Sequence, residues 1–208
     1  MANELGPVPD PPPLASPLPP ADPARGEPVA WLKDHYIYPS DLGRAGLDNL
    51  IISTLFTDYV REQGIEPTPA QLASHRRWMK KAQEEDPKPR PKDQGVLDTM
   101  LDKMFGKAIE SSFDGVFAKA MVLQWLVDKS LYEKYGGRVI FQQANPSEPV
   151  GAYRAFLQSH ERRGTFRIFD AAARDKFWKY YTTNHSMEVP KDQIDFSKPW
   201  WEKPPGPD

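Results

Sequence analysis

Proline is the feature that most constrains this chain. Of 208 residues 23 are proline, and ten of these lie between Pro7 and Pro28. Because proline fixes φ and has no N–H, such a stretch builds neither a helix nor a strand ladder. We therefore predict residues 1–29 to be a disordered, extended, polyproline-like tether. It acts either as a spacer or as a ligand for an aromatic groove on a partner.

Composition and charge exclude several classes of protein. The chain has no cysteine, which excludes disulfides, thiolate metal sites, iron–sulfur clusters and cysteine nucleophiles. It has no run of about 18 apolar residues, so we expect no membrane-spanning helix. The net charge is −2, and four acids against one base give residues 1–29 a net charge of −3. The remainder is nearly neutral, which argues against nucleic acid as a partner.

The rest of the chain has mainly helical periodicity. Apolar residues recur at i, i+3 and i+4, and glycine, proline and capping residues bound each segment. Thr68 and Pro69 are typical of a helix start, and Gly64 of a helix end. The pattern predicts helices over residues 47–64, 69–85, 97–109, 113–136, 150–164 and 171–181.

Two short segments read as strands instead. Residues 138–143 and 165–169 are rich in β-branched and aromatic residues, and one predicted helix separates them. We therefore expect a mostly α fold of five to six helices with a small two-stranded β element. The helical domain would span residues 30–190, and residues 191–208 would form an irregular tail containing proline and tryptophan.

One helical corner resembles a known family. The run from Leu47 to Trp78 is similar to the N-terminal helical region of SurA-type periplasmic chaperones and related parvulin-linked foldases, through Gly64, Ile65, Thr68 and Leu72. No parvulin catalytic domain is recognisable. The resemblance implies a chaperone-like helical module without isomerase activity.

Soft and aromatic residues are the first candidates for a binding surface. Methionine and aromatic side chains in a cleft make an adaptable surface for apolar segments, whereas in the interior they are simply core. The candidates for client or partner binding are Met100, Met104, Phe105, Phe113, Met121, Trp125, Trp200 and Trp201. We expect the two C-terminal tryptophans to dock either on the body of this chain or on a partner, because large aromatics are costly to leave in water.

A second candidate surface is basic. Arg76, Arg77, Lys80 and Lys81 lie together around Trp78 on the predicted helix over 69–85. Such a patch contacts an anionic partner or is a solvated helix face. No histidine pair has metal-ligand spacing and no glycine-rich phosphate loop occurs, so we predict no metal and no cofactor.

Three functions remain open on the sequence alone. The first is a non-enzymatic protein-binding module, chaperone-like in covering apolar segments of a protein or peptide partner. The second is a structural subunit that docks through its tails. The third is an enzyme of unknown class that uses His160, Glu161 or His185. No secretory signal follows Met1, so we expect a cytoplasmic protein, or a periplasmic or envelope-tethered one if a signal or anchor has been removed.

Overall fold

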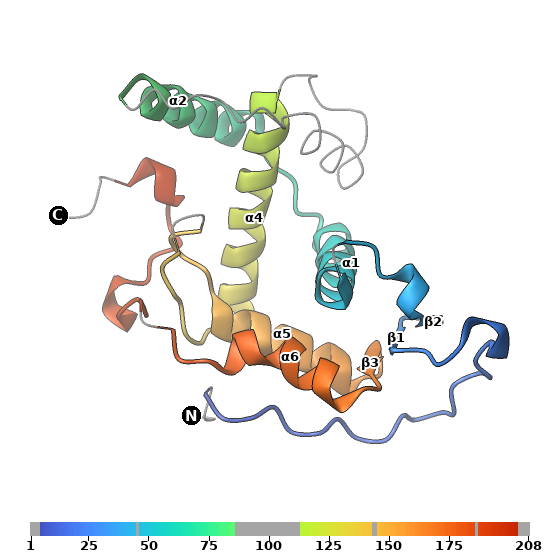
Figure 1. Cartoon of the computed structure of the whole chain (residues 1–208). Coiled ribbons are helices and arrows are strands. Elements are labelled where there is room, and N and C mark those ends of the chain that lie inside the picture. Colours follow the sequence, from blue (N-terminus) through green and yellow to red (C-terminus); the bar gives the residue numbers. More distant parts are fainter. Residues whose placement is uncertain (1–4, 45, 86–112, 143–144, 186, 204–208) are drawn as a thin grey trace. The chain divides into compact units, whose positions relative to one another are not determined.

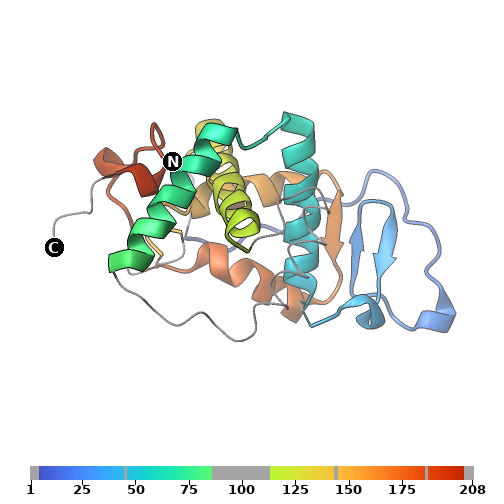
Figure 2. The ribbon, with the colours of Figure 1, turned by 90° about the horizontal axis from the view of Figure 1, so that it is seen from above.

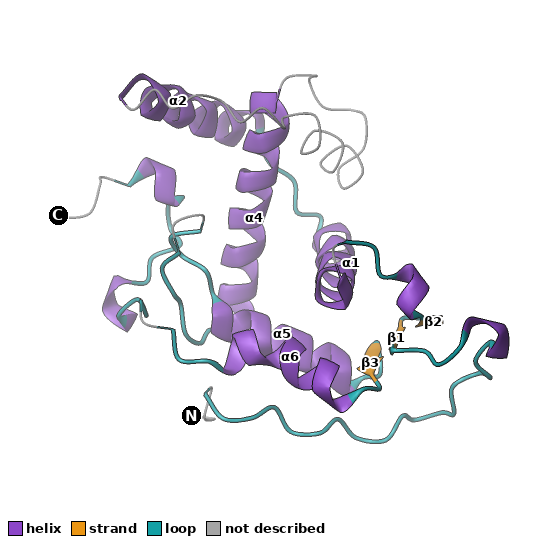
Figure 3. Cartoon of the chain, in the orientation of Figure 1, coloured by secondary structure: helices purple, strands orange, loops and turns teal. Residues whose placement is uncertain are grey.

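A computed structural model describes residues 5–44, 46–85, 113–142, 145–185 and 187–203, without the side chains of residues 113 and 114. The predicted helix over 97–109 lies outside the described residues. The described chain is mostly helical (Figures 1 and 3). It divides into two compact units, and each is described by itself. Unit 1 comprises Met1–Arg61 and Leu131–Ile194, and unit 2 comprises Glu62–Ser130 and Asp195–Asp208.

The described residues contain five α-helices, each within a few residues of a predicted range. Four short 3-10 helices accompany them, at Pro23–Arg25, Pro39–Asp41, Lys191–Gln193 and Trp200–Glu202. The α-helices are α1 (Gly46–Gln63), α2 (Pro69–Glu85), α4 (Phe113–Tyr135), α5 (Val150–Arg162) and α6 (Ala171–Thr182).

The predicted helix caps account for these bounds. Helix α2 begins at Pro69, and Thr68 Oγ1 accepts a hydrogen bond from the Gln71 N–H at 3.3 Å. The Gln71 side chain accepts the Thr68 N–H in return at 2.8 Å, which completes a capping box. Asp170 accepts the Ala173 N–H at the start of α6. Gly64 has φ of +60°, the left-handed conformation expected just after a helix end.

The predicted two-stranded element is wrong. The structure has a three-stranded antiparallel sheet in the order β2-β1-β3, formed by β1 (Ala30–Leu32), β2 (His35–Ile37) and β3 (Phe166–Ile168). Figure 2 shows the β1–β2 hairpin beside β3. Strand β3 lies in the predicted segment 165–169, but its partner is β1, which pairs Ala30 with Ile168 and Leu32 with Phe166.

Within the described residues 138–142 of the other predicted strand (138–143), Ile140 forms isolated bridges. Ile140 exchanges two backbone hydrogen bonds with Glu148, and Phe141 donates to the Met187 carbonyl. Sequence analysis does not detect the hairpin strands, because each is three residues long and is too short to show an alternation of apolar and polar residues. Lys33, in the two-residue turn between them, has φ of +61° without being glycine.

The core of unit 1 forms where α5 meets α1. Phe156 of α5 is 2% exposed. Its ring centroid lies 5.6 Å from that of Phe56 and 5.3 Å from that of Tyr59, both of α1. Ile51 and Leu55 complete the buried stripe of α1. Each such buried side chain stabilises the fold by about 1.5–3 kcal/mol. This packing therefore fixes the position of α5, and other residues of α5 belong to the site described below.

The glycine that ends α5 gives a stability prediction. Gly164 has φ of +75°, and a Cβ built on it would lie 2.7 Å from Leu14 Cδ2. We expect Gly164→Ala to lower the free energy of unfolding by about 1–2 kcal/mol, mainly because alanine is strained at positive φ. Gly43→Ala is the control, since Gly43 has an ordinary φ and an added Cβ meets nothing within 4 Å. Equal urea midpoints for the two variants would contradict the prediction.

Candidate functional site

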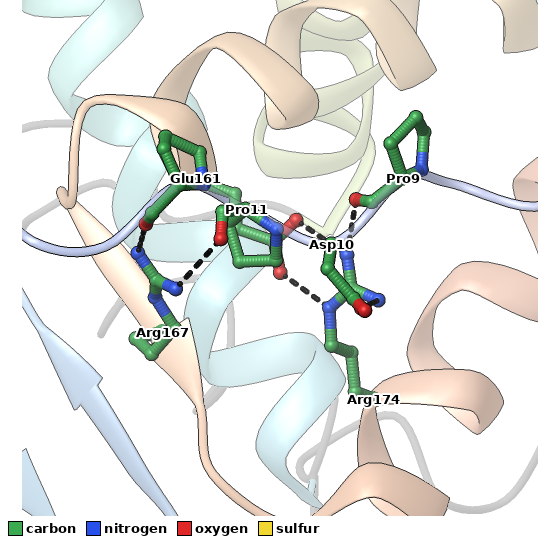
Figure 4. A network of polar contacts seen from close by, with 7 residues as sticks. Pro9, Asp10, Pro11, Glu161, Arg167 and Arg174 are labelled. Carbon is green, nitrogen blue, oxygen red and sulfur yellow. Dashed lines mark hydrogen bonds and ion pairs between the residues drawn. The ribbon is translucent and has the colours of Figure 1, made fainter.

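Three arginines of unit 1 hold the N-terminal proline-rich segment through its backbone. They come from three consecutive elements, α5, β3 and α6, and each donates to carbonyl oxygens of the segment. Figure 4 shows Arg167 and Arg174 beside Pro9, Asp10 and Pro11. The contacts are Arg154 Nη2 to Gly6 O (2.7 Å), Arg174 Nη2 to Pro9 O (2.9 Å), Arg167 Nη1 to Pro11 O (3.4 Å) and Arg167 Nη2 to Pro12 O (2.7 Å).

The chemistry of proline explains why arginine makes these contacts. A proline-rich backbone offers carbonyl acceptors but few N–H donors, so it cannot pair with another strand in the usual way. A guanidinium group carries five N–H donors and no acceptor. The sequence Pro11-Pro12-Pro13 therefore presents carbonyl acceptors without N–H donors, which suits a donor-rich guanidinium group.

A buried ion pair positions the central arginine. Glu161 of α5 is 1% exposed, and its two oxygens accept from Arg174 Nε at 2.9 Å and from Arg174 Nη2 at 3.0 Å. This bidentate pairing raises the pKa of the Arg174 guanidinium, because Glu161 favours the charged form. Nε and Nη2 of Arg174 both donate to Glu161. This pairing holds the guanidinium group so that Nη2 also reaches Pro9 O and Nη1 faces Asp10. Arg174 Nη1 lies 3.2 Å from the Asp10 carboxylate.

Two tyrosines of the hairpin region extend the contacts along the segment. The Tyr36 hydroxyl donates to the Pro19 carbonyl at 2.7 Å, and the Tyr38 hydroxyl accepts the Asp22 N–H at 2.8 Å. Arg25 lies over the Tyr38 ring, 4.2 Å from its centroid. Polar contacts therefore follow the segment from Gly6 to Arg25, and Figure 1 shows it running past α5 and α6 toward the hairpin. The described part of the predicted tether thus contacts the rest of unit 1 from Gly6 to Arg25.

A cavity of about 370 Å³ lies beside Pro7 and Val8 of the proline-rich segment. The segment supplies one wall and α6 supplies the other. Its lining residues are Pro7, Val8, Arg174, Asp175, Lys176, Trp178, Lys179 and Thr182. The cavity therefore exists only while the segment is docked.

The methionine and aromatic candidates fall in unit 2 or outside the described residues. Met100, Met104 and Phe105 lie outside them, as does the side chain of Phe113. Trp125 and Trp201 are buried, at 6% and 5% exposure, and pack together with Val122. Met121 and Trp200 are half-buried. The C-terminal tryptophans thus dock on helices of unit 2.

Unit 2 also buries a histidine that the sequence does not single out. His75 of α2 is fully buried, and its ring packs against Trp201 with centroids 4.8 Å apart. Burial lowers the pKa of His75 to about 4. Its position on the apolar side of α2 was the only signal in the sequence.

The basic candidates lie on the same helix and do not converge on a pocket. Arg77, Lys80 and Lys81 are exposed and Arg76 is half-buried. Lys80 and Lys81 face Glu84 and Glu85 one turn on, at 4.0 and 3.7 Å. A phosphate ligand would have to compete with these carboxylates.

The three residues of the enzymatic alternative have separate partners. His160 packs on Phe156, with ring centroids 4.5 Å apart, and burial lowers the pKa of His160 to about 4. Glu161 binds Arg174. His185 donates from Nε2 to the Tyr180 carbonyl at 2.9 Å. No contact links the three within the described part of the chain.

Tyr180 takes part in a further polar cluster. Its hydroxyl donates to the Glu148 carboxylate, at 2.8 and 2.9 Å from the two oxygens, and accepts from the Gln142 amide. Burial raises the pKa of Tyr180 and of Glu148. The hydrogen bond from Tyr180 to Glu148 joins α6 to the turn before α5. Because the Tyr180 hydroxyl stays protonated, it is a poor nucleophile.

Sequence analysis missed the three arginines, and it named Glu161 only as a candidate catalytic residue, not as their ion-pair partner. One signal was present: Arg154 lies among the buried residues Val150, Tyr153 and Leu157 on α5. A charged residue within an apolar helix face indicates a dedicated partner. Arg167 and Arg174 occupy ordinary positions on a strand and a helix, and nothing in the sequence distinguishes them.

Comparison with known proteins gives no relative. No protein family, curated protein or solved structure matches the chain. None of the described helices has the length and apolar character needed to cross a membrane. In the same residues, no three histidine, aspartate or glutamate side chains cluster as metal ligands would.

The buried ion pair gives a stability prediction. We expect Arg174→Ala to lower the free energy of unfolding by about 3–5 kcal/mol, because it leaves Glu161 charged, buried and unpaired. The double variant Arg174→Met with Glu161→Gln should recover part of this loss. Arg61→Ala is the control: its pair with Asp58 is exposed on the arginine side, so the loss should stay below about 1 kcal/mol. Chemical denaturation followed by circular dichroism measures all three, and similar losses for Arg174→Ala and Arg61→Ala would refute the prediction.

Proposed function

We propose that this chain is a non-enzymatic protein-binding module that binds extended, proline-rich segments at the face formed by Arg154, Arg167 and Arg174. The observation that carries the proposal is the set of arginine hydrogen bonds to four carbonyl groups of the chain's own segment, those of Gly6, Pro9, Pro11 and Pro12. The partner in this proposal is a proline-rich stretch of another protein, and residues 5–19 occupy its place in the free chain.

The form of recognition supports a peptide rather than a small molecule. Contacts to carbonyl groups depend on an extended backbone and not on particular side chains, and a polyproline stretch is ordered before it binds, so little conformational entropy is lost. Selectivity would come from two additional contacts. Asp10 adds a charge beside Arg174, and the cavity beside Pro7 and Val8 has room for a larger side chain.

The covalent link makes the segment a competitor for partners. A tethered ligand is present at an effective concentration of about millimolar, so a partner must bind more tightly or the segment must first loosen. In this proposal the proline-rich segment is a ligand, but for the chain's own arginine face and not for an aromatic groove on a partner.

Chaperone-like covering of apolar segments belongs to the same class of function. It requires an accessible apolar surface, and the candidates with described side chains are buried or half-buried in unit 2. A chaperone-like activity, and the relationship to SurA-type proteins, are therefore proposals that rest on the sequence. The arginine face rests on geometry and is the stronger basis for the protein-binding role.

Binding of a peptide added to the full-length chain tests the proposal. The probe is a fluorescent peptide with the sequence of residues 5–19, and the measurement is fluorescence anisotropy. Asp10→Arg places a positive charge beside Arg174 and weakens docking of the chain's own segment. We expect this variant to bind the peptide about fivefold more tightly than the wild type does, because it loses an ion pair whose carboxylate is 96% exposed, worth about 1 kcal/mol at most.

Removing a donor should reverse this gain. In the Asp10→Arg background, Arg167→Ala should weaken peptide binding by about tenfold, because Arg167 bonds Pro11 and Pro12 directly. Arg162→Ala is the matched control, an exposed arginine at the end of α5. The proposal is wrong if the Asp10→Arg chain fails to bind the peptide, or if the two arginine variants bind it equally.

A further inference from the structure

His75 occupies an aromatic box in unit 2 that satisfies neither of its ring nitrogens. The residue is fully buried, and within the described residues neither Nδ1 nor Nε2 has a hydrogen-bond partner. Four aromatic rings surround it. Their centroids lie at 4.8 Å (Trp201), 5.6 Å (Trp78), 6.1 Å (Phe117) and 6.2 Å (Trp200) from that of His75.

The C-terminal segment forms the lid of this box. Trp200 and Trp201 come from residues 195–203, which are distant in sequence from α2 and α4. Trp201 also packs on Trp125 of α4, with centroids 5.9 Å apart. A hydrogen bond from the Ser74 hydroxyl to the Glu202 carboxylate joins the lid to α2. The lid is therefore held mainly by apolar contact around the histidine.

Such a box accepts a neutral imidazole and rejects a charged one. An imidazolium has two N–H donors, and the surrounding rings offer no carboxylate or carbonyl to receive them. Desolvation is the single cause that lowers the pKa of His75 to about 4, and no nearby charge contributes. Two independent features, the geometry of the box and its lack of acceptors, thus favour the neutral form.

We propose that His75 is an acid-operated latch, whose protonation releases residues 195–203 from α2 and α4 and exposes the apolar surface beneath them. The exposed surface comprises Leu72, Val122, Trp125 and Leu126, which pack against the tryptophan lid when it is closed. The latch lies in unit 2 and is independent of the arginine face in unit 1.

Asp195 of the lid does not titrate with the latch. Ser197 and Lys203 hold the pKa of Asp195 at about 2, so this carboxylate stays ionised throughout the range of histidine titration. The arginines and lysines keep their charge at any pH of interest here. Arg76 and Arg77 follow His75 in the sequence of α2. On α4, Lys129 Nζ lies 5.6 Å from the centroid of the Trp125 ring, and on the lid Glu202 contacts Ser74 and Lys203 pairs with Asp195.

The direction of the pH effect follows from the two states of the lid. When the lid is open, His75 is exposed and titrates near the ordinary value of 6.5; when it is closed, the pKa is about 4. Above pH 6.5 both states are neutral and pH has no effect. Between pH 6.5 and 4 the open state binds the extra proton, so the closed state loses stability as pH falls. These two values give a decrease of about 30-fold in the closed-to-open ratio between pH 7.5 and pH 5.

Hydrogen exchange of the full-length chain measures this ratio directly. The backbone N–H of Glu202 donates to the Pro199 carbonyl and that of Lys203 to the Trp200 carbonyl, so both report on the closed lid. We expect their protection factors, corrected for the intrinsic pH dependence of exchange, to fall about 30-fold from pH 7.5 to pH 5. In His75→Phe, which keeps an aromatic ring in the box, the factors should be unchanged.

Two controls separate the latch from other effects of acid. His160→Phe removes the buried histidine of unit 1 and should leave the 30-fold decrease intact. Glu202→Gln should weaken the lid equally at both pH values. NMR titration of the His75 ring needs no variant, and a pKa of His75 near 6.5 in the folded chain would overturn the proposal. An equal decrease of the protection factors in His75→Phe and in the wild type would overturn it as well.

Discussion

The buried pair of Glu161 and Arg174 is the interaction on which the N-terminal half of unit 1 depends. A carboxylate at 1% exposure needs a partner, and α6 supplies one in bidentate geometry. The pair joins α5 to α6 and turns the remaining N–H groups of Arg174 toward the proline-rich segment. Arg154 and Arg167 then add donors on either side of the same path. A single electrostatic constraint thus connects the helical core with a segment that forms no regular structure of its own.

The helices were predictable because their signals are local. Thr68 and Pro69 before α2, Asp170 before α6 and Gly164 after α5 each mark a boundary that the structure confirms within a residue or two. The strands were not predictable to the same extent. The partner of β3 lies more than 130 residues earlier, at Ala30–Leu32, and a three-residue strand has no detectable period. Residues 138–143 have strand-like composition, yet they bond to Glu148 and Met187 as a loop does.

The candidate site was less accessible to sequence reasoning than the fold. Arginine hydrogen bonds to a distant backbone leave no motif, because any exposed carbonyl satisfies them. Arg167 and Arg174 are separated from Pro12 and Pro9 by 155 and 165 positions. His75 is a similar case: its burial depends on Trp200 and Trp201, and nothing near His75 in the sequence indicates that these residues return to α2. Both sites form through long-range contacts that only the folded chain brings together.

Because its prolines lack N–H groups, the proline-rich segment also resists aggregation by strand pairing between copies of the molecule. An extended stretch lying against a protein surface normally presents an edge to which another chain adds a strand, and this is a common route to aggregation. The run of prolines from Pro11 to Pro13 offers no donors for such a ladder. The chain therefore keeps a long extended segment on its surface, including the exposed Leu5, without providing a template for intermolecular sheets.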